Sequence, residues 1–205
     1  MPVSLMVCVP TFDRAIRSLC AESLGNAIEH ADSLGLLEMV VHRYQMGYDI
    51  ARARNLMAQW ALEEGVDKLL MVDSDMVLPK DALSRLLDND VDVCLGWYVH
   101  GTSDAETNMV KWGGRGYGDC FTASELAGMS GRVRVRAGGL GCALVDTGVF
   151  GRFQRPWFEY RDFKDGSALS EDYDFCRKCD AAGVPVWVDA SVACGHIHER
   201  VLEAR

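Results

Sequence analysis

One apolar run followed by two carboxylates constrains this chain more than any other stretch. Residues 69–72 carry little but large apolar side chains and predict a fully buried strand. Asp73 and Asp75 follow this run, one residue apart, and Pro79 comes soon after. Ligands of open α/β sheets bind at the carboxyl ends of the strands. The two carboxylates therefore stand where such a fold does its chemistry and suit Mg²⁺ or Mn²⁺. Two solvated turn residues are the alternative.

Around this run, strand-like and helix-like segments alternate. Strands are predicted from apolar runs at 3–9, 36–41, 69–72 and 91–98. Helices are predicted from helical spacing and end signals at 15–28, 49–62 and 79–87. The alternation predicts βαβ units and a mostly parallel sheet.

The second half has a different character. Residues 101–131 are rich in Gly, Ser and Thr and predict a loop region with short strands, as in functional loops. A strand to Val145, a helix over 170–183 and two short strands at 185–188 and 191–193 complete the chain. Because no repeat or linker interrupts it, we expect a single domain over 1–205.

Composition limits the possible functions. The chain has 205 residues, 49% of them hydrophobic, and a net charge of −9. This charge argues against a general nucleic-acid coat or an anionic membrane surface. The sequence has no apolar run of membrane-spanning length and no signal-peptide pattern at its start. Its eight cysteines lie largely in apolar segments and predict buried free thiols in a cytoplasmic protein.

Two stretches of the first half carry candidate ligand contacts. Thr11 and Arg14 follow the first strand, where a hydroxyl and a guanidinium can meet a nucleotide, although a capped helix start explains them equally well. Arg54 and Asn55 lie on the second predicted helix, where an arginine can bind a diphosphate bidentately. A solvated helix face is the alternative for this pair.

Two stretches of the second half complete the set. Glu171 and Asp172 begin a helix, where the partial positive charge favours ionised acids. A carboxylate held there beside a cleft can also take a proton from an acceptor hydroxyl. His196 and His198 are two apart on an extended segment, so they point the same way, and one of them can complete a metal site with the aspartates.

In this order, the stretches resemble the metal-dependent nucleotide-sugar glycosyltransferases with the GT-A fold, especially glycosyltransferase family 2. The likeness covers 3–198 and consists of a Val-Pro-Thr strand end, a Gly…Ala-Arg-Asn helix, Asp-x-Asp, Gly-Gly, Glu-Asp and a terminal Gly-His. It implies an α/β, single-domain, Rossmann-like fold whose central sheet is mostly parallel, with a smaller antiparallel portion on the acceptor side. Residues up to about 100 would form the nucleotide-binding half, and about 101–205 the acceptor-binding half.

The resemblance also implies roles. The enzyme would use Mn²⁺ or Mg²⁺ and a nucleotide sugar, with a UDP-sugar favoured, and transfer the sugar with inversion. The acceptor would be a sugar, a protein or a hydroxymethylated DNA base. Asp172 would be the general base, with Glu171 positioning it or binding acceptor. The metal ligands would be Asp73, Asp75 and His196, with His198 as the alternative histidine. The donor would contact Pro10, Thr11, Arg14, Arg54, Asp73, Gly138 and Gly139.

Further implications are less specific. Trp97 and Trp157 could stack on a sugar, with core packing as the alternative. Residues 41–44 lack the acidic side chains that many family members carry after the second strand, which leaves the base of the donor open.

Two rival hypotheses stay open at this stage. The first is a binding domain with a structural zinc site made of Cys176, Cys179, Cys194 and His196. The second is a nucleotidyltransferase, although the first strand is not followed by a Gly-rich phosphate loop. In addition, alternating arginines at 132, 134 and 136 predict either an edge strand with a solvated face or a contact for a polyanion such as DNA.

Overall fold

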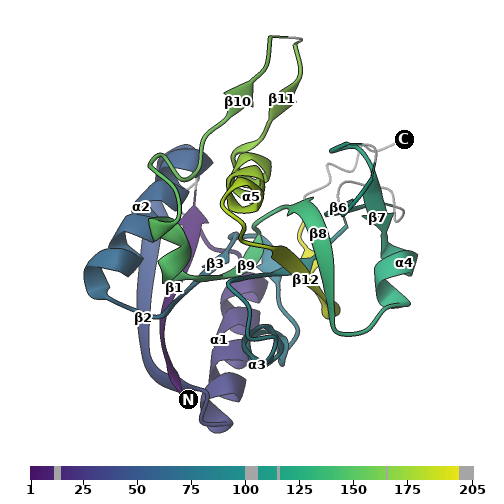
Figure 1. Cartoon of the computed structure of the whole chain (residues 1–205). Coiled ribbons are helices and arrows are strands. Elements are labelled where there is room, and N and C mark those ends of the chain that lie inside the picture. The colour runs from purple at the N-terminus through teal and green to yellow at the C-terminus, as the bar shows by residue number, and fades with distance from the viewer. Residues whose placement is uncertain (12–14, 100–105, 115, 165, 199–205) are drawn as a thin grey trace, which may run out of the picture.

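The computed structural model describes residues 1–11, 15–99, 106–114, 116–164 and 166–198. Its centre is a nine-stranded sheet in the order β2-β1-β3-β9-β5-β12-β8-β6-β7 (Figure 1). The strands are β1 (Val3–Thr11), β2 (Leu37–Met46), β3 (Lys68–Val72), β5 (Val93–Trp97), β6 (Glu106–Lys111), β7 (Cys120–Thr122), β8 (Arg132–Gly138), β9 (Cys142–Asp146) and β12 (Val186–Ala193).

Most strands of this sheet point in one direction. The parallel pairs are β1–β2, β1–β3 and β5–β12, whereas β7, β8 and β9 run against the other strands. The prediction of a mostly parallel α/β sheet with an antiparallel portion is confirmed. One antiparallel strand, β9, lies at the middle of the sheet between β3 and β5, so antiparallel pairing is not confined to one end.

Helices cover both faces. On one face lie α1 (Ser18–Ser33) and α3 (Ala82–Asp88), and on the other lie α2 (Ile50–Glu64) and α5 (Glu171–Ala181), as their separate core clusters show. The short helix α4 (Ala123–Ala127) and the 3₁₀ turn η1 (Thr147–Gly151) complete the helical elements. Asp49 caps α2 by accepting a hydrogen bond from the Arg52 N–H, and Gly65 ends it with a φ of 67°.

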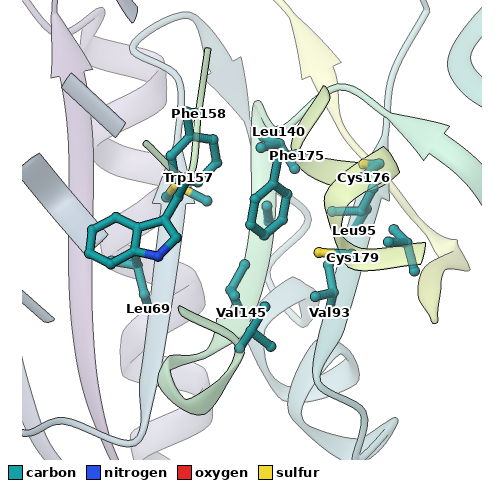
Figure 2. Packing of buried hydrophobic residues seen from close by; sticks show 14 of the residues in the cluster. Leu69, Val93, Leu95, Leu140, Val145, Trp157, Phe158, Phe175, Cys176 and Cys179 are labelled. Carbon is teal, nitrogen blue, oxygen red and sulfur yellow. The ribbon is translucent and has the colours of Figure 1, made fainter. Parts of the chain in front are cut away.

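Aromatic side chains fill the layer between the sheet and α5. The rings of Phe158 and Phe175 stack at 4.7 Å, and Figure 2 shows them beside Leu140. Trp97 and Trp157 are buried, and their indole N–H groups donate to the carbonyls of Ala190 and Phe150. Both tryptophans are therefore core residues, and the prediction that they stack on a sugar is wrong.

Two small strand pairs lie outside the main sheet. The strands β10 (Arg161–Asp162) and β11 (Ala168–Leu169) form a hairpin that projects from the body at the top of Figure 1. The strands β4 (Met76–Val77) and β13 (Gly195–His196) pair antiparallel, which brings the last described segment of the chain beside the end of β3. Distant parts of the sequence thus meet at the acidic pair.

Two predictions about the second half are wrong. The two closing strands are one strand, β12, with an irregular register between Val188 and Ala193. The arginine-bearing strand β8 is interior, between β12 and β6, because it pairs on both sides. Among the helices of the described residues, none has the length and apolar character needed to cross a membrane.

Candidate active site

The two aspartates follow the buried strand β3, as the sequence predicts. The Asp73 N–H donates to the Gly141 carbonyl at 2.9 Å, and the Asp73 carbonyl accepts from the Met76 N–H at 3.1 Å. The second bond closes a tight turn between β3 and β4, and the first ties this turn to the residue before β9. Both carboxylates are partly exposed in the turn. The turn therefore fixes where the carboxylates project at the carboxyl end of the sheet.

Arg54 joins two of the predicted site residues inside the protein. Arg54 is 2% exposed, and its guanidinium donates to both oxygens of Asp73, at 3.0 and 3.2 Å, and to Oε1 of Glu171. Burial opposes the charge of Arg54, but Asp73 and Glu171 outweigh it and hold its pKa above the usual value. With both sides of its fork occupied by protein, Arg54 is buried between carboxylates, and the prediction of a direct donor contact does not fit this placement.

Glu171 is the buried end of this network. It is 4% exposed, and burial raises its pKa even though Arg54 opposes the shift. Its carboxylate faces Arg54 inside the protein, so it does not reach an acceptor. The prediction that Glu171 positions Asp172 is compatible with this contact, because the two residues are consecutive in α5.

Asp75 contacts two residues of the last described segment. Its Oδ2 lies 3.4 Å from Nε2 of His196, and its carbonyl accepts from the Ile197 N–H at 2.8 Å. The hydrogen bond between the two side chains lowers the pKa of Asp75 and raises the pKa of His196. The pairing of β13 with β4 thus brings together two of the side chains that the sequence assigns to a metal.

The second histidine lies next to the first. The rings of His196 and His198 are 4.2 Å apart, which confirms that they are neighbours on the extended segment. Within the described ranges, no group of three or more His, Cys, Asp or Glu side chains is already arranged to hold a metal ion. Because both oxygens of Asp73 accept hydrogen bonds from Arg54, Asp75 and a histidine are the remaining candidate ligands for a metal ion. The metal assignment stays a prediction.

A first cavity opens beside the acidic pair. It has a volume of about 420 Å³ and includes Pro10 and Thr11 at the end of β1 together with Asp73 and Asp75. Tyr48, Asp49 and Tyr160 also line it. Pro10 and Thr11 thus line the same cavity as the acidic pair, and their contact with a donor stays a prediction, whereas Arg14 is outside the described residues. The two tyrosines were not predicted as site residues, because neither belongs to a motif.

A second cavity of about 430 Å³ adjoins Asp172. Asp172 Oδ1 accepts from the Ser170 hydroxyl and from the Tyr173 N–H at 2.8 Å, which holds the carboxylate at the start of α5. Glu106, Asn108 and Tyr173 also line the cavity. Glu106 and Asn108 were not predicted as site residues, because residues 101–131 carry no clear pattern.

Glycines let two walls approach each other closely. A Cβ at Gly139 would lie 2.5 Å from the Tyr98 hydroxyl, and one at Gly141 would lie 3.1 Å from Oδ2 of Asp73. A Cβ at Gly138 would lie 2.5 Å from the Met109 sulfur, inside the core. Gly139 does line the second cavity, but packing against Tyr98 and Met109 already accounts for both predicted donor glycines.

The structure does not assemble the rival zinc site. Cys176 and Cys179 belong to the core cluster beneath α5, whereas Cys194 belongs to the cluster on the α1 side of the sheet. Figure 2 shows the first two sulfurs within the apolar layer near Leu95 and Val93. Burial raises the pKa of Cys176 to about 12, which opposes the thiolate that zinc requires. All eight cysteines are free, and most are buried, as predicted.

The three arginines of β8 are also engaged by the protein. The guanidinium carbons of Arg132 and Arg134 lie 5.2 and 3.5 Å from the ring centres of Trp187 and Trp112. Arg136 donates to the Gly114 carbonyl at 3.3 Å. A row of free guanidinium groups facing a polyanion is therefore absent from this strand as the structure describes it.

Sheet order, layers and the site at the carboxyl end of β3 together define a Rossmann-like GT-A fold, which confirms the predicted fold class. Solved structures with similar folds include the A197 protein from STIV, with a TM-score of 0.59 and 16% identity over 96% of this chain and 86% of that one. They also include GalNAc-T7 with UDP, GalNAc and Mn²⁺, with a TM-score of 0.60 and 13% identity over 96% of this chain.

The chain spans 44% of the GalNAc-T7 chain. At these identities the likeness establishes the shared fold. No family model matches the sequence, and a search of curated proteins finds no significant match.

Proposed function

We propose that this protein transfers a sugar from a nucleotide sugar to an acceptor hydroxyl. The observation that carries the proposal is the pair of cavities, one lined by Asp73 and Asp75 and the other by Asp172. The buried Arg54 connects them, because it bonds Asp73 on one side and Glu171, the neighbour of Asp172, on the other. Two substrate sites linked through one buried side chain suit a transfer between two bound molecules.

The donor would occupy the first cavity. Its lining includes Asp49, Asp73 and Asp75. Arg54 already pairs with Asp73, but Asp49 and Asp75 would repel a nucleoside diphosphate unless a cation neutralised them. Asp75 and His196 supply a carboxylate oxygen and an imidazole nitrogen, a donor set that suits Mn²⁺ or Mg²⁺ when diphosphate oxygens and water complete the coordination. When bound, such a cation would neutralise charge on the departing diphosphate.

The likeness to GalNAc-T7, whose structure holds UDP and Mn²⁺, supports a UDP-sugar as the first donor to test. Tyr48 and Tyr160 give the cavity exposed aromatic surface that a base can stack on. Pro10 and Thr11 line the same wall, where their backbone would contact the donor.

Asp172 would act as the general base. The Ser170 hydroxyl and the Tyr173 N–H both bind its Oδ1, so the carboxylate keeps one orientation toward the second cavity. The acceptor O–H would give its proton to Asp172 as the acceptor oxygen bonds the anomeric carbon. The bond from that carbon to the diphosphate oxygen breaks, and the diphosphate leaves with the electron pair. Attack from the side opposite the leaving group inverts the anomeric configuration.

A panel of nucleotide sugars tests this proposal. The protein is incubated with each donor and Mn²⁺, and release of nucleoside diphosphate is measured with water as the acceptor. We expect turnover of at least one donor, a loss of at least about tenfold for Asp75→Asn, and no change for Asp32→Asn, an exposed aspartate on α1 with the same charge change. If no donor is bound or hydrolysed with any divalent cation, the proposal is wrong.

A further inference from the structure

The walls of the second cavity hold their neutral polar groups in internal hydrogen bonds. Asn108 accepts from the Tyr98 N–H at 3.0 Å and donates to the Gly139 carbonyl at 3.3 Å. The Thr107 hydroxyl donates to the Phe121 carbonyl at 2.8 Å. Both side chains are at most 6% exposed. These groups shape the cavity, but they offer a ligand few free donors.

Two carboxylates remain available to a ligand. Glu106 is exposed at the start of β6, and the hydrogen bonds that the described residues give Asp172 fall on Oδ1. No lysine or arginine is among the described residues that line this cavity. The available groups are therefore hydrogen-bond acceptors with negative charge, and they suit a ligand that donates hydrogen bonds.

Aromatic rings form the apolar part of the lining. Tyr98 and Tyr173 both line the cavity, and Tyr173 stacks on Tyr117 at 5.8 Å with an interplanar angle of 28°. The Tyr117 ring thus packs against the Tyr173 ring that lines the cavity. The volume of about 430 Å³ lies within the roughly 300–1,000 Å³ of small-molecule sites. A saccharide ring, with an apolar C–H face and hydroxyl donors on its rim, matches this combination.

We infer that the acceptor is a neutral saccharide and that Glu106, with Asp172, selects against acceptors that carry phosphate. The inference rests on the proposed function, since Asp172 is the base there. A phosphate beside two carboxylates meets like charges that no described cation in the wall offsets, and such repulsive elements discriminate between ligands of equal shape. DNA is disfavoured as the acceptor for the same reason. In addition, the arginines of β8 already contact the rings of Trp187 and Trp112 and the Gly114 carbonyl.

The test compares acceptors that differ by one phosphate. With the donor and metal found above, transfer is measured to neutral methyl glycosides, to the same glycosides carrying a 6-phosphate, and to duplex DNA containing 5-hydroxymethylcytosine. We expect at least one neutral glycoside to be used at least about tenfold better than its phosphorylated partner and better than the DNA.

A charge reversal then tests the residue. We expect Glu106→Lys to raise the ratio of phosphorylated to neutral acceptor turnover by at least about tenfold. Glu38→Lys, the same change at an exposed site on β2, should leave this ratio unchanged. A ratio is used because a loss of folded protein lowers both rates equally.

The outcomes separate the two proposals. Equal or better use of phosphorylated glycosides or DNA overturns the inference, as does donor hydrolysis that no neutral glycoside intercepts. In both cases the glycosyltransferase proposal stands. An unchanged ratio in Glu106→Lys overturns the role of Glu106. If no donor is turned over, the proposed function itself fails, and the inference fails with it.

Discussion

Removing the charge of Arg54 should destabilise this protein far more than removing a surface charge. Arg54→Met keeps a long apolar side chain but leaves Glu171, at 4% exposure, as a buried carboxylate without its cation. Removing one partner of a buried ion pair typically costs about 3–5 kcal/mol. The loss of the contact with Asp73 adds less to this destabilisation, because 28% of the Asp73 side chain is exposed and water can solvate it. We expect the free energy of unfolding at pH 7 to fall by about 3–5 kcal/mol.

The protein supplies a matched control. Arg43 pairs with Glu64 at 2.5 Å, but the two side chains are 46% and 40% exposed. Exposed pairs contribute about 0–1 kcal/mol, so Arg43→Met should cost no more than that. Urea unfolding followed by circular dichroism measures both variants, and the slope with denaturant shows whether each remains a cooperative fold.

The loss in Arg54→Met should depend on pH in a definite direction. Burial already raises the pKa of Glu171 in the native protein, and without Arg54 nothing in the pair opposes that shift. The folded variant then binds a proton that the unfolded chain, with an ordinary glutamate pKa, releases. Stability of the variant therefore falls as the pH rises from the unfolded pKa through the folded one. Its deficit should shrink between pH 7 and pH 5, and Glu171→Gln in the same background should restore part of it.

Two results would refute this reasoning. A loss below about 1 kcal/mol would mean that water or another cation solvates Glu171, contrary to its burial. A deficit of equal size at pH 5 and pH 7 would mean that lost packing of the Arg54 side chain, and not an unpaired charge, causes the destabilisation.

Three further predictions concern stability and reactivity. Asp174 is fully buried against three basic side chains. Burial opposes its charge, but these cations outweigh burial and lower its pKa, so stability should fall as the pH drops below about 4. Asp174→Asn should weaken this dependence, measured by urea unfolding. Gly139→Ala places a Cβ 2.5 Å from the Tyr98 hydroxyl and should lower the free energy of unfolding by about 1–3 kcal/mol. Gly25→Ala, in open space within α1, should instead raise it by about 0.5–1 kcal/mol. Thermal melts measure both variants. Iodoacetamide should label the partly exposed Cys120 first, and equal labelling of all eight cysteines in native protein, seen by mass spectrometry, would contradict the buried thiols.

Local patterns were sufficient for most elements of the first half, although β4 and the last residues of β2 were not predicted. The uncharged run before Asp73 predicts β3, and Asp49 and Gly65 mark the two ends of α2, because capping and backbone preferences act within a few residues. Alternation of apolar strands with amphipathic helices was enough to predict the fold class. The order of the polar motifs along the chain also indicated which strand end carries the acidic pair.

Contacts between distant residues needed the tertiary structure. From the sequence, the helix face that carries Arg54 could equally be exposed to solvent. Only the packing of α2 against α5 shows that Arg54 is buried between Asp73 and Glu171. Glu171 is 117 positions away from Arg54 in the sequence. The interior place of β8 and the insertion of β9 between β3 and β5 likewise follow from strand pairing, which no local pattern encodes. The sequence by itself determined most elements of the first half and the chemical groups at their ends. Tertiary packing decided which of those groups are buried as partners of one another and which are left facing a cavity, because desolvation and ion pairing depend on neighbours that are remote in the chain.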